Sequence, residues 1–140
     1  MMIEDEIFGK LSLIEASQHE QSYLLGAKLF SPLNYEVEYN IYTVNKIVSK
    51  NQREFLIEIE KRYAVLKNQI EKFINSEIKK IDTKSKNYTL ENDLKLCLIS
   101  IPESIDLEVE WSIEYALNKD FAFFTVEFKD WEPFWLSISA

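Results

Sequence analysis

The sequence predicts an α+β domain in which one long helix packs on an antiparallel sheet of about seven strands, built in two runs. Three observations lead to this prediction. Segments that alternate apolar and polar residues, the period of a half-buried strand, occupy both ends of the chain. Residues 50–80 contain no Gly or Pro and repeat apolar residues at helical spacing. Short, turn-rich links favour hairpins over crossovers.

The first run of strands precedes the helix. We expect strands at 8–14, 23–30 and 35–44, separated by polar or turn-forming segments. Gly26 lies inside the second strand, where a glycine indicates a bulge or a close approach of another backbone. Two sets of side chains alternate along the third strand: Tyr35, Val37, Tyr39, Ile41 and Thr43 against Glu36, Glu38, Asn40 and Tyr42.

The helix should begin after Ser49 and end between residues 78 and 81. Ser49 can cap the first turn, and Gln52 three residues later completes a capping box. Glu58 and Arg62 add a favourable pair four residues apart. The face that we expect to pack on the sheet carries a broad apolar stripe: Phe55, Leu56, Ile59, Tyr63, Leu66, Ile70, Phe73 and Ile74.

Four further strands are expected at 93–101, 107–117, 121–129 and 134–139. The third of them is almost wholly apolar at its centre, which indicates an interior strand buried on both faces. In the first, one face should carry Leu94, Leu96 and Leu98, and the other Lys95, Cys97, Ile99 and Ile101. In the last, Phe134, Leu136 and Ile138 should face away from Trp135, Ser137 and Ser139.

The strand at 107–117 has the most regular alternation. One set of side chains is apolar and the other is largely acidic: Leu107, Val109, Trp111, Ile113 and Tyr115 against Asp106, Glu108, Glu110, Ser112 and Glu114. Because side chains alternate along a strand, this pattern predicts a buried apolar face backed by a row of carboxylates.

Composition favours one compact domain over residues 1–140. The chain is 46% hydrophobic, 14% aromatic and carries a formal net charge of −8, most of it in the strand-rich ends. The acidic balance argues against a nucleic-acid binder. We find no secretory signal and no apolar run long enough to span a bilayer, so we expect a cytoplasmic protein without a membrane partner.

The residues give no indication of catalysis, a cofactor or a metal. One His (His19) and one Cys (Cys97) cannot form a zinc site, and two glycines (Gly9 and Gly26) cannot form a phosphate-binding loop. Cys97 lies mid-strand between apolar residues, which predicts a buried, unreactive thiol. We therefore expect a protein that is not an enzyme.

Carboxylates and tryptophans make up the candidate partner surface. Trp131 or Trp135, each next to an acidic or aromatic residue, is an aromatic anchor of the kind enriched at protein interfaces. The acidic strands supply charge complementary to a basic partner. The candidate partner-binding residues are Glu36, Glu38, Glu108, Glu110, Glu114, Trp131 and Trp135.

The order of these segments also resembles a known group of proteins. An opening Phe8-Gly9-Lys10-Leu11, a strand containing Gly26, a long helix and a closing strand that ends in Thr125–Pro133 are similar in layout to small bacterial domains of unknown function. Some of these domains are immunity proteins of polymorphic or contact-dependent toxin systems. The resemblance implies a cytoplasmic inhibitor that binds one cognate toxin domain, and an acidic surface would suit a basic toxin.

Two hypotheses about function follow. The first is an immunity-type inhibitor that binds and neutralises a basic toxin domain through an acidic, aromatic-edged surface. The second is a structural or regulatory domain that self-associates through an exposed sheet edge or helix stripe. A toxin gene directly upstream would favour the first hypothesis.

Overall fold

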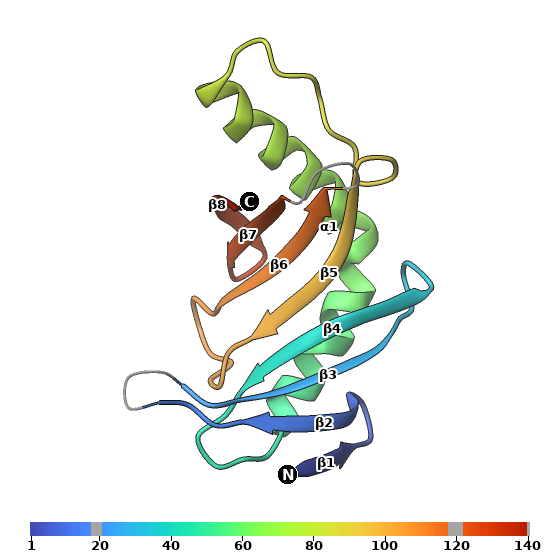
Figure 1. The fold of residues 1–140 in the computed structure, drawn as a ribbon, viewed down its shortest axis with the longest axis vertical. Helices are drawn as coiled ribbons and strands as arrows, with labels where there is room; N and C mark the ends of the chain where they lie inside the picture. The colour runs from blue at the N-terminus through green and yellow to red at the C-terminus, as the bar shows by residue number, and fades with distance from the viewer. Residues whose placement is uncertain (18–20, 118–121, 140) are drawn as a thin grey trace.

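The computed structural model describes residues 1–17, 21–117 and 122–139 of the 140-residue chain. These residues form a twisted sheet of eight strands and one helix that lies across one face of the sheet (Figure 1). The elements follow one another in this order: β1 (Met2–Asp5), β2 (Gly9–Ile14), β3 (Tyr23–Phe30), β4 (Tyr35–Tyr42), α1 (Lys50–Ile81), β5 (Leu94–Ile101), β6 (Glu110–Leu117), β7 (Phe123–Lys129) and β8 (Glu132–Ser139).

The strands lie in the sheet in the same order as in the sequence, with β1 at one edge and β8 at the other. Neighbouring strands are antiparallel except β4 and β5, which run parallel. The parallel pair arises because α1 carries the chain back along the sheet before β5 begins (Figure 1). The predicted α+β fold is confirmed, and the two antiparallel runs meet in one parallel pair.

The predicted capping box starts α1. The Ser49 hydroxyl accepts a 3.1 Å hydrogen bond from the backbone N–H of Gln52, and the Gln52 side chain accepts a 3.0 Å bond from the backbone N–H of Ser49. The helix continues to Ile81. Lys79 and Lys80 lie in its last turn, where their positive charges interact favourably with the negative end of the helix dipole. Both predicted helix boundaries are therefore confirmed.

Gln52 also ties the helix to the sheet. Its amide nitrogen donates 2.8 Å hydrogen bonds to the carbonyl oxygens of Tyr42, which ends β4, and of Pro102, which follows β5. The residue is only 1% exposed, so its side chain satisfies two backbone acceptors that water reaches poorly. The helix start is thereby fixed at the carboxyl ends of the parallel pair.

The core lies between α1 and the sheet. The buried residues of the helix are Gln52, Phe55, Leu56, Ile59, Tyr63, Leu66, Ile70, Ile74 and Ile78. This is the predicted stripe, except that Ile78 extends it and Phe73 is only partly buried. Facing strands supply alternate residues, such as Tyr39 from β4 and Trp111 from β6, as the period of two requires.

The sequence did not predict β1, because a four-residue strand with two acidic side chains has little strand character. Asp5, its last residue, is only 6% exposed and forms an ion pair with Arg53 at 2.8 Å. Asp5 also accepts 3.0 Å hydrogen bonds from the backbone N–H groups of Ile7 and Phe8. Burial alone would raise the pKa of Asp5, but these bonds outweigh it and hold the pKa below its usual value.

A β-bulge in β5 makes the predicted alternation wrong after Leu96. The register of β5 against β6 shifts between Leu96 and Leu98, so Cys97 is the extra residue. Beyond the bulge the faces exchange. Leu96 and Ile99 are both buried in the core, whereas Leu98 points to the opposite side.

Two further strand predictions need correction. The strand expected at 107–117 begins at Glu110, because Glu108 adopts a left-handed conformation with φ of 60° and Leu107 is 93% exposed in the preceding turn. β7 is buried on one face only, with Phe124, Val126 and Phe128 inside and Phe123 exposed, because α1 covers a single side of the sheet.

Gly26 marks a close approach, as predicted, and not a bulge. A Cβ at this position would lie 2.6 Å from the carbonyl oxygen of Lys10, in a register that stays regular. His19, Phe121 and residues 118–120, which link two of the predicted strands, lie outside the described residues.

Candidate functional site

One side of the sheet carries no covering layer among the described elements. Figure 1 looks onto this side, with α1 behind the strands. We call it the open face, and the strand registers assign it these side chains: Tyr23, Leu25, Ala27, Leu29, Glu36, Glu38, Asn40, Tyr42, Lys95, Cys97, Leu98, Ser100, Glu110, Ser112, Glu114, Ala116, Phe123, Thr125, Glu127 and Lys129. The open face therefore combines carboxylates with exposed apolar side chains.

The open face is hollowed where β4, β5 and β6 meet. We call this depression, about 610 Å³ in volume, the acidic hollow. It is lined by Ala27, Glu36, Val37, Glu38, Lys95, Leu96, Cys97, Leu98, Glu114, Ala116 and Phe123. Three of the predicted partner-binding residues, Glu36, Glu38 and Glu114, thus come together although β4 and β6 lie far apart in the sequence.

Two neighbours hold Glu114 at the edge of the hollow. One carboxylate oxygen lies 3.6 Å from the Cys97 sulfur, and the other accepts a 3.4 Å hydrogen bond from the Thr125 hydroxyl. The Cys97 thiol also donates to the backbone carbonyl of Glu114 at 3.2 Å. Desolvation and the nearby carboxylate raise the pKa of Cys97 to about 12, so the sulfur stays protonated at neutral pH.

The prediction that Cys97 is buried is only partly right. The thiol is partly exposed on the open face, because Cys97 follows the core residue Leu96 and therefore points to the opposite side of the sheet. Its lack of reactivity remains a prediction. Burial disfavours the thiolate most, and the carboxylates of Glu114, on a neighbouring strand, and of Glu38 add to this effect.

Glu110 lies on the same face, farther along β6. It borders a smaller depression with Tyr42, Ser100 and Glu127, and its carboxylate is 4.0 Å from the ammonium of Lys129. Glu108 does not join this row. It stands two residues before the strand in the left-handed turn, so the predicted pairing of Glu108 and Glu110 on one strand face is wrong.

The two candidate tryptophans lie on opposite sides of the sheet. Trp131 is partly buried on the helix side, where its ring stacks on Phe55 at 5.1 Å and the Arg62 guanidinium lies 4.3 Å above it. Trp135 is 57% exposed on the edge strand β8, and its register opposite Glu127 places it beside the open face. Only Trp135 is therefore near the acidic residues and accessible.

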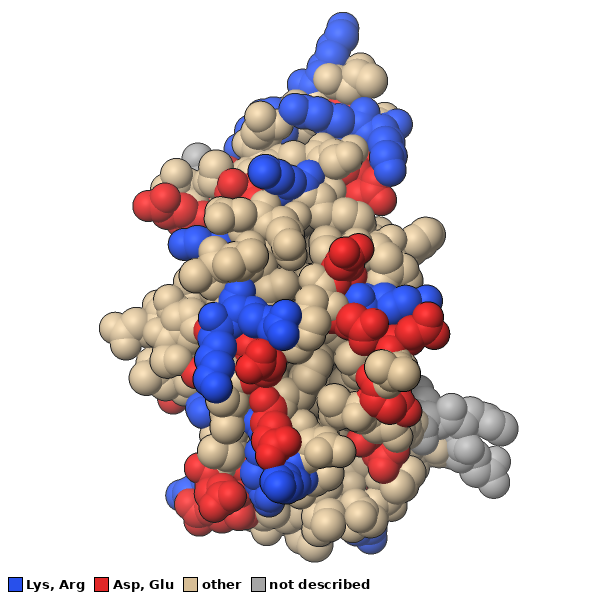
Figure 2. Space-filling view, turned by 180° about the vertical axis from the view of Figure 1, so that it is seen from behind, with Lys and Arg blue, Asp and Glu red and all other residues tan. Residues whose placement is uncertain are grey.

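Basic residues gather elsewhere. Figure 2 shows the face over α1, where Lys and Arg side chains crowd the upper end of the molecule. The last turn of α1, which contains Lys79 and Lys80, lies at this end (Figure 1). On the rest of this face, basic and acidic side chains are mixed. A positively charged partner would thus meet a more favourable field on the open face.

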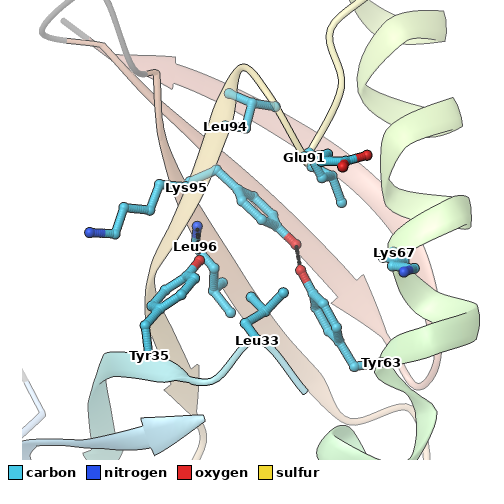
Figure 3. Close-up of a pocket in the computed structure, with 10 residues that line it drawn as sticks. Leu33, Tyr35, Tyr63, Lys67, Glu91, Leu94, Lys95 and Leu96 are labelled. Atoms are coloured by element: carbon cyan, nitrogen blue, oxygen red, sulfur yellow. Dashed lines mark hydrogen bonds between the residues drawn. The ribbon is translucent and has the colours of Figure 1, made fainter. Parts of the chain in front are cut away.

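A second concavity, about 520 Å³ in volume, was not predicted. It opens between α1 and the starting ends of β4 and β5, and three tyrosines line it: Tyr35, Tyr63 and Tyr115 (Figure 3). Sequence reasoning took these residues as ordinary core positions. The available signal was that three inward positions on three separate elements all carry a hydroxyl, which needs a partner when buried.

The described residues hold neither a cluster of metal-ligating side chains nor a membrane-spanning helix. They contain no group of three or more His, Cys, Asp or Glu side chains placed to hold a metal ion. The single described helix lacks the apolar stretch needed to cross a bilayer. Comparison of the chain with protein-family models, with curated proteins and with solved structures finds no match.

Proposed function

We propose that this protein is an immunity-type inhibitor that binds a basic bacterial toxin domain through the open face of its sheet. The observation that supports the proposal most is the acidic hollow, in which Glu36, Glu38 and Glu114 surround an accessible depression in a sheet face that α1 leaves uncovered. The proposal makes the protein a cytoplasmic binding protein that acts stoichiometrically and without catalysis.

Charge and apolar area on the open face have separate roles in this proposal. Carboxylates attract a basic partner and select it over others, mainly by accelerating association. Exposed apolar side chains, with Trp135 and Phe123 the largest, would slow dissociation once the surfaces meet. Glu110 extends the acidic area beyond the hollow, although Lys129 partly neutralises it.

Co-expression tests whether such a partner exists. The gene beside this one, expressed alone and then with this protein, should be toxic alone and harmless in combination. The two purified proteins should form a complex of fixed stoichiometry. If the neighbouring product is not toxic and does not bind the purified protein, the inhibitor proposal is wrong.

The tryptophans provide a matched pair of variants for the same complex. Trp135→Ala should accelerate dissociation by about tenfold or more while leaving the unfolding temperature nearly unchanged. Trp131→Ala should instead lower the unfolding temperature, because Trp131 packs on Phe55 and Trp111. If both variants accelerate dissociation equally and neither lowers the unfolding temperature, the assignment of the interface to the open face is wrong.

One observation favours the alternative function, self-association. β8 is an eight-residue edge strand that exposes Phe134, Trp135 and Ile138, whereas the opposite edge, β1, has four residues and two of them are acidic. Long apolar edges invite pairing with another strand. Sedimentation of the wild type as a dimer, and of the Ile138→Lys variant as a monomer, would support this alternative.

A further inference from the structure

The tyrosine-lined cavity has the dimensions and lining of a small-molecule site. Its volume of about 520 Å³ falls within the range of ligand pockets, roughly 300–1,000 Å³. Leu33, Leu90, Leu94 and Leu96 form apolar walls, and the other lining residues are three tyrosines, two lysines and one glutamate. Figure 3 shows Tyr63 reaching into this space from α1 and Tyr35 from β4.

Three tyrosine hydroxyl groups line the cavity, and two of them keep a proton for which the described residues supply no acceptor. Tyr63 and Tyr115 share a 3.0 Å hydrogen bond between their hydroxyls, and both side chains are at most 2% exposed. In such a pair one hydroxyl donates and the other accepts, so the accepting hydroxyl still has its own proton to donate. The Tyr35 hydroxyl accepts a 3.0 Å bond from the Leu96 N–H and likewise keeps its proton.

These hydroxyls are donors at neutral pH. Burial raises the pKa of Tyr63 to about 12 and that of Tyr115 well above its usual value, so neither becomes a phenolate. Ionised Tyr35 would raise the pKa of both further, consistent with the three hydroxyls facing one space. Two O–H donors are therefore left for an acceptor on a ligand in this cavity.

A cation stands beside these donors. Lys67 follows Tyr63 by four residues, so both project from the same side of α1, and both line the cavity. Among the described residues, Lys67 has no ion-pair partner within 4.0 Å, and neither has Glu91, which also lines the cavity. Lys95 also borders the cavity, but its side chain extends away from the tyrosine pair toward the open face (Figure 3), so Lys67 is the positive charge on the helix side.

We propose that this cavity binds a small carboxylate with an apolar body, separately from any protein partner at the open face. The carboxylate accepts one hydrogen bond from the Tyr63–Tyr115 pair, from the hydroxyl whose proton is free, and lies near the ammonium of Lys67. The apolar body packs against the leucines of the wall. Hydroxyl donors and a lysine around an anion recur in carboxylate recognition because such hydrogen bonds are charge-assisted.

Octanoate is a suitable probe, with 1-octanol as its uncharged counterpart. Titration of the wild-type protein, followed by backbone amide NMR, should give saturable shifts at Lys67, Leu90 and Leu94 with octanoate. The double variant Tyr63→Phe/Tyr115→Phe keeps both rings and should weaken octanoate binding by about tenfold or more. Lys67→Gln should weaken it as well, most strongly at low salt.

Control variants separate recognition from general perturbation. Tyr42→Phe removes a hydroxyl from the open face, and Lys61→Gln removes an exposed lysine from α1, so both should bind octanoate like the wild type. Unchanged amide spectra outside the cavity would show that the variants fold. The proposal is wrong if octanoate does not saturate, if 1-octanol binds equally well, or if the double variant binds like the wild type.

Discussion

Gln52 connects three parts of the fold through one side chain. Its carbonyl oxygen completes the cap of α1, and its two N–H groups satisfy the backbone at the ends of both parallel strands. The sequence indicated the cap, because a Ser followed three residues later by Gln is a local pattern. It could not indicate the bonds to Tyr42 and Pro102, because they depend on how the helix docks.

Replacement of Gln52 by Ala should therefore cost more than the loss of a surface cap. We expect the free energy of unfolding to fall by about 2–4 kcal/mol, because buried backbone acceptors lose their donors as well. Chemical denaturation measures the change, with Gln69→Ala, an exposed position on the same helix, as the control. A loss below about 1 kcal/mol would show that water replaces the amide.

The Asp5–Arg53 pair predicts a pH dependence of stability. The pKa of Asp5 is lower in the folded protein than the unfolded value of 3.8. Its stabilising contribution is therefore fully present above about pH 3.8 and is lost as the pH falls through the lower folded pKa.

We expect the stability difference between the wild type and Asp5→Asn to be constant near neutral pH and to shrink in acid. Denaturation curves of both proteins across this pH range measure the difference. A gap that stays constant down to the lowest pH at which both proteins fold would contradict the lowered pKa.

Cys97 offers a second prediction at the scale of a residue. With its pKa raised to about 12, the thiol should react slowly with iodoacetamide in the native state at neutral pH. Glu114→Gln removes the adjacent negative charge and should accelerate labelling, whereas Glu54→Gln on the exposed side of α1 should not. Mass spectrometry measures the rate of labelling. Fast labelling of the wild type would contradict the raised pKa of Cys97.

At the scale of elements, α1 was predictable and the details of the strands were less so. The helix has a cap, an uninterrupted apolar period and 32 residues, so many local signals agree. The bulge at Cys97 and the left-handed turn at Glu108 have weaker signals, because apolar residues occupy both sides of each irregularity. The predicted alternation therefore runs past the bulge in β5 and begins too early, before Glu110, in β6.

The helix stripe can be tested by truncating single side chains. Leu66→Ala or Ile70→Ala should lower the free energy of unfolding by ~2–5 kcal/mol, because each buried side chain leaves a cavity between α1 and the sheet. The neighbouring exposed residue provides the control, and Val65→Ala should cost less than about 0.5 kcal/mol. Similar losses at Leu66 and Val65 would place the wrong face of the helix on the sheet.

At the scale of the whole molecule, one helix covers one face of an eight-stranded sheet, and this asymmetry creates the candidate site. Of the acidic residues chosen from the sequence, Glu36, Glu38 and Glu114 line one hollow because their strands flank β5. Strand order is a long-range property, so the pattern of single strands could not show that these residues meet. The same holds for the tyrosine cavity, whose walls come from α1 and three strands.

The central claim, that the open face binds a basic protein, is tested most directly by the affinity of charge-reversed variants for the co-expressed partner. Glu36→Lys/Glu38→Lys changes the hollow, while Glu15→Lys/Glu54→Lys makes the same change in net charge outside the open face. We expect the first variant to bind at least about tenfold more weakly, with a larger loss at low salt, and the second to bind nearly as well as the wild type. Equal affinities for the two variants would contradict the claim.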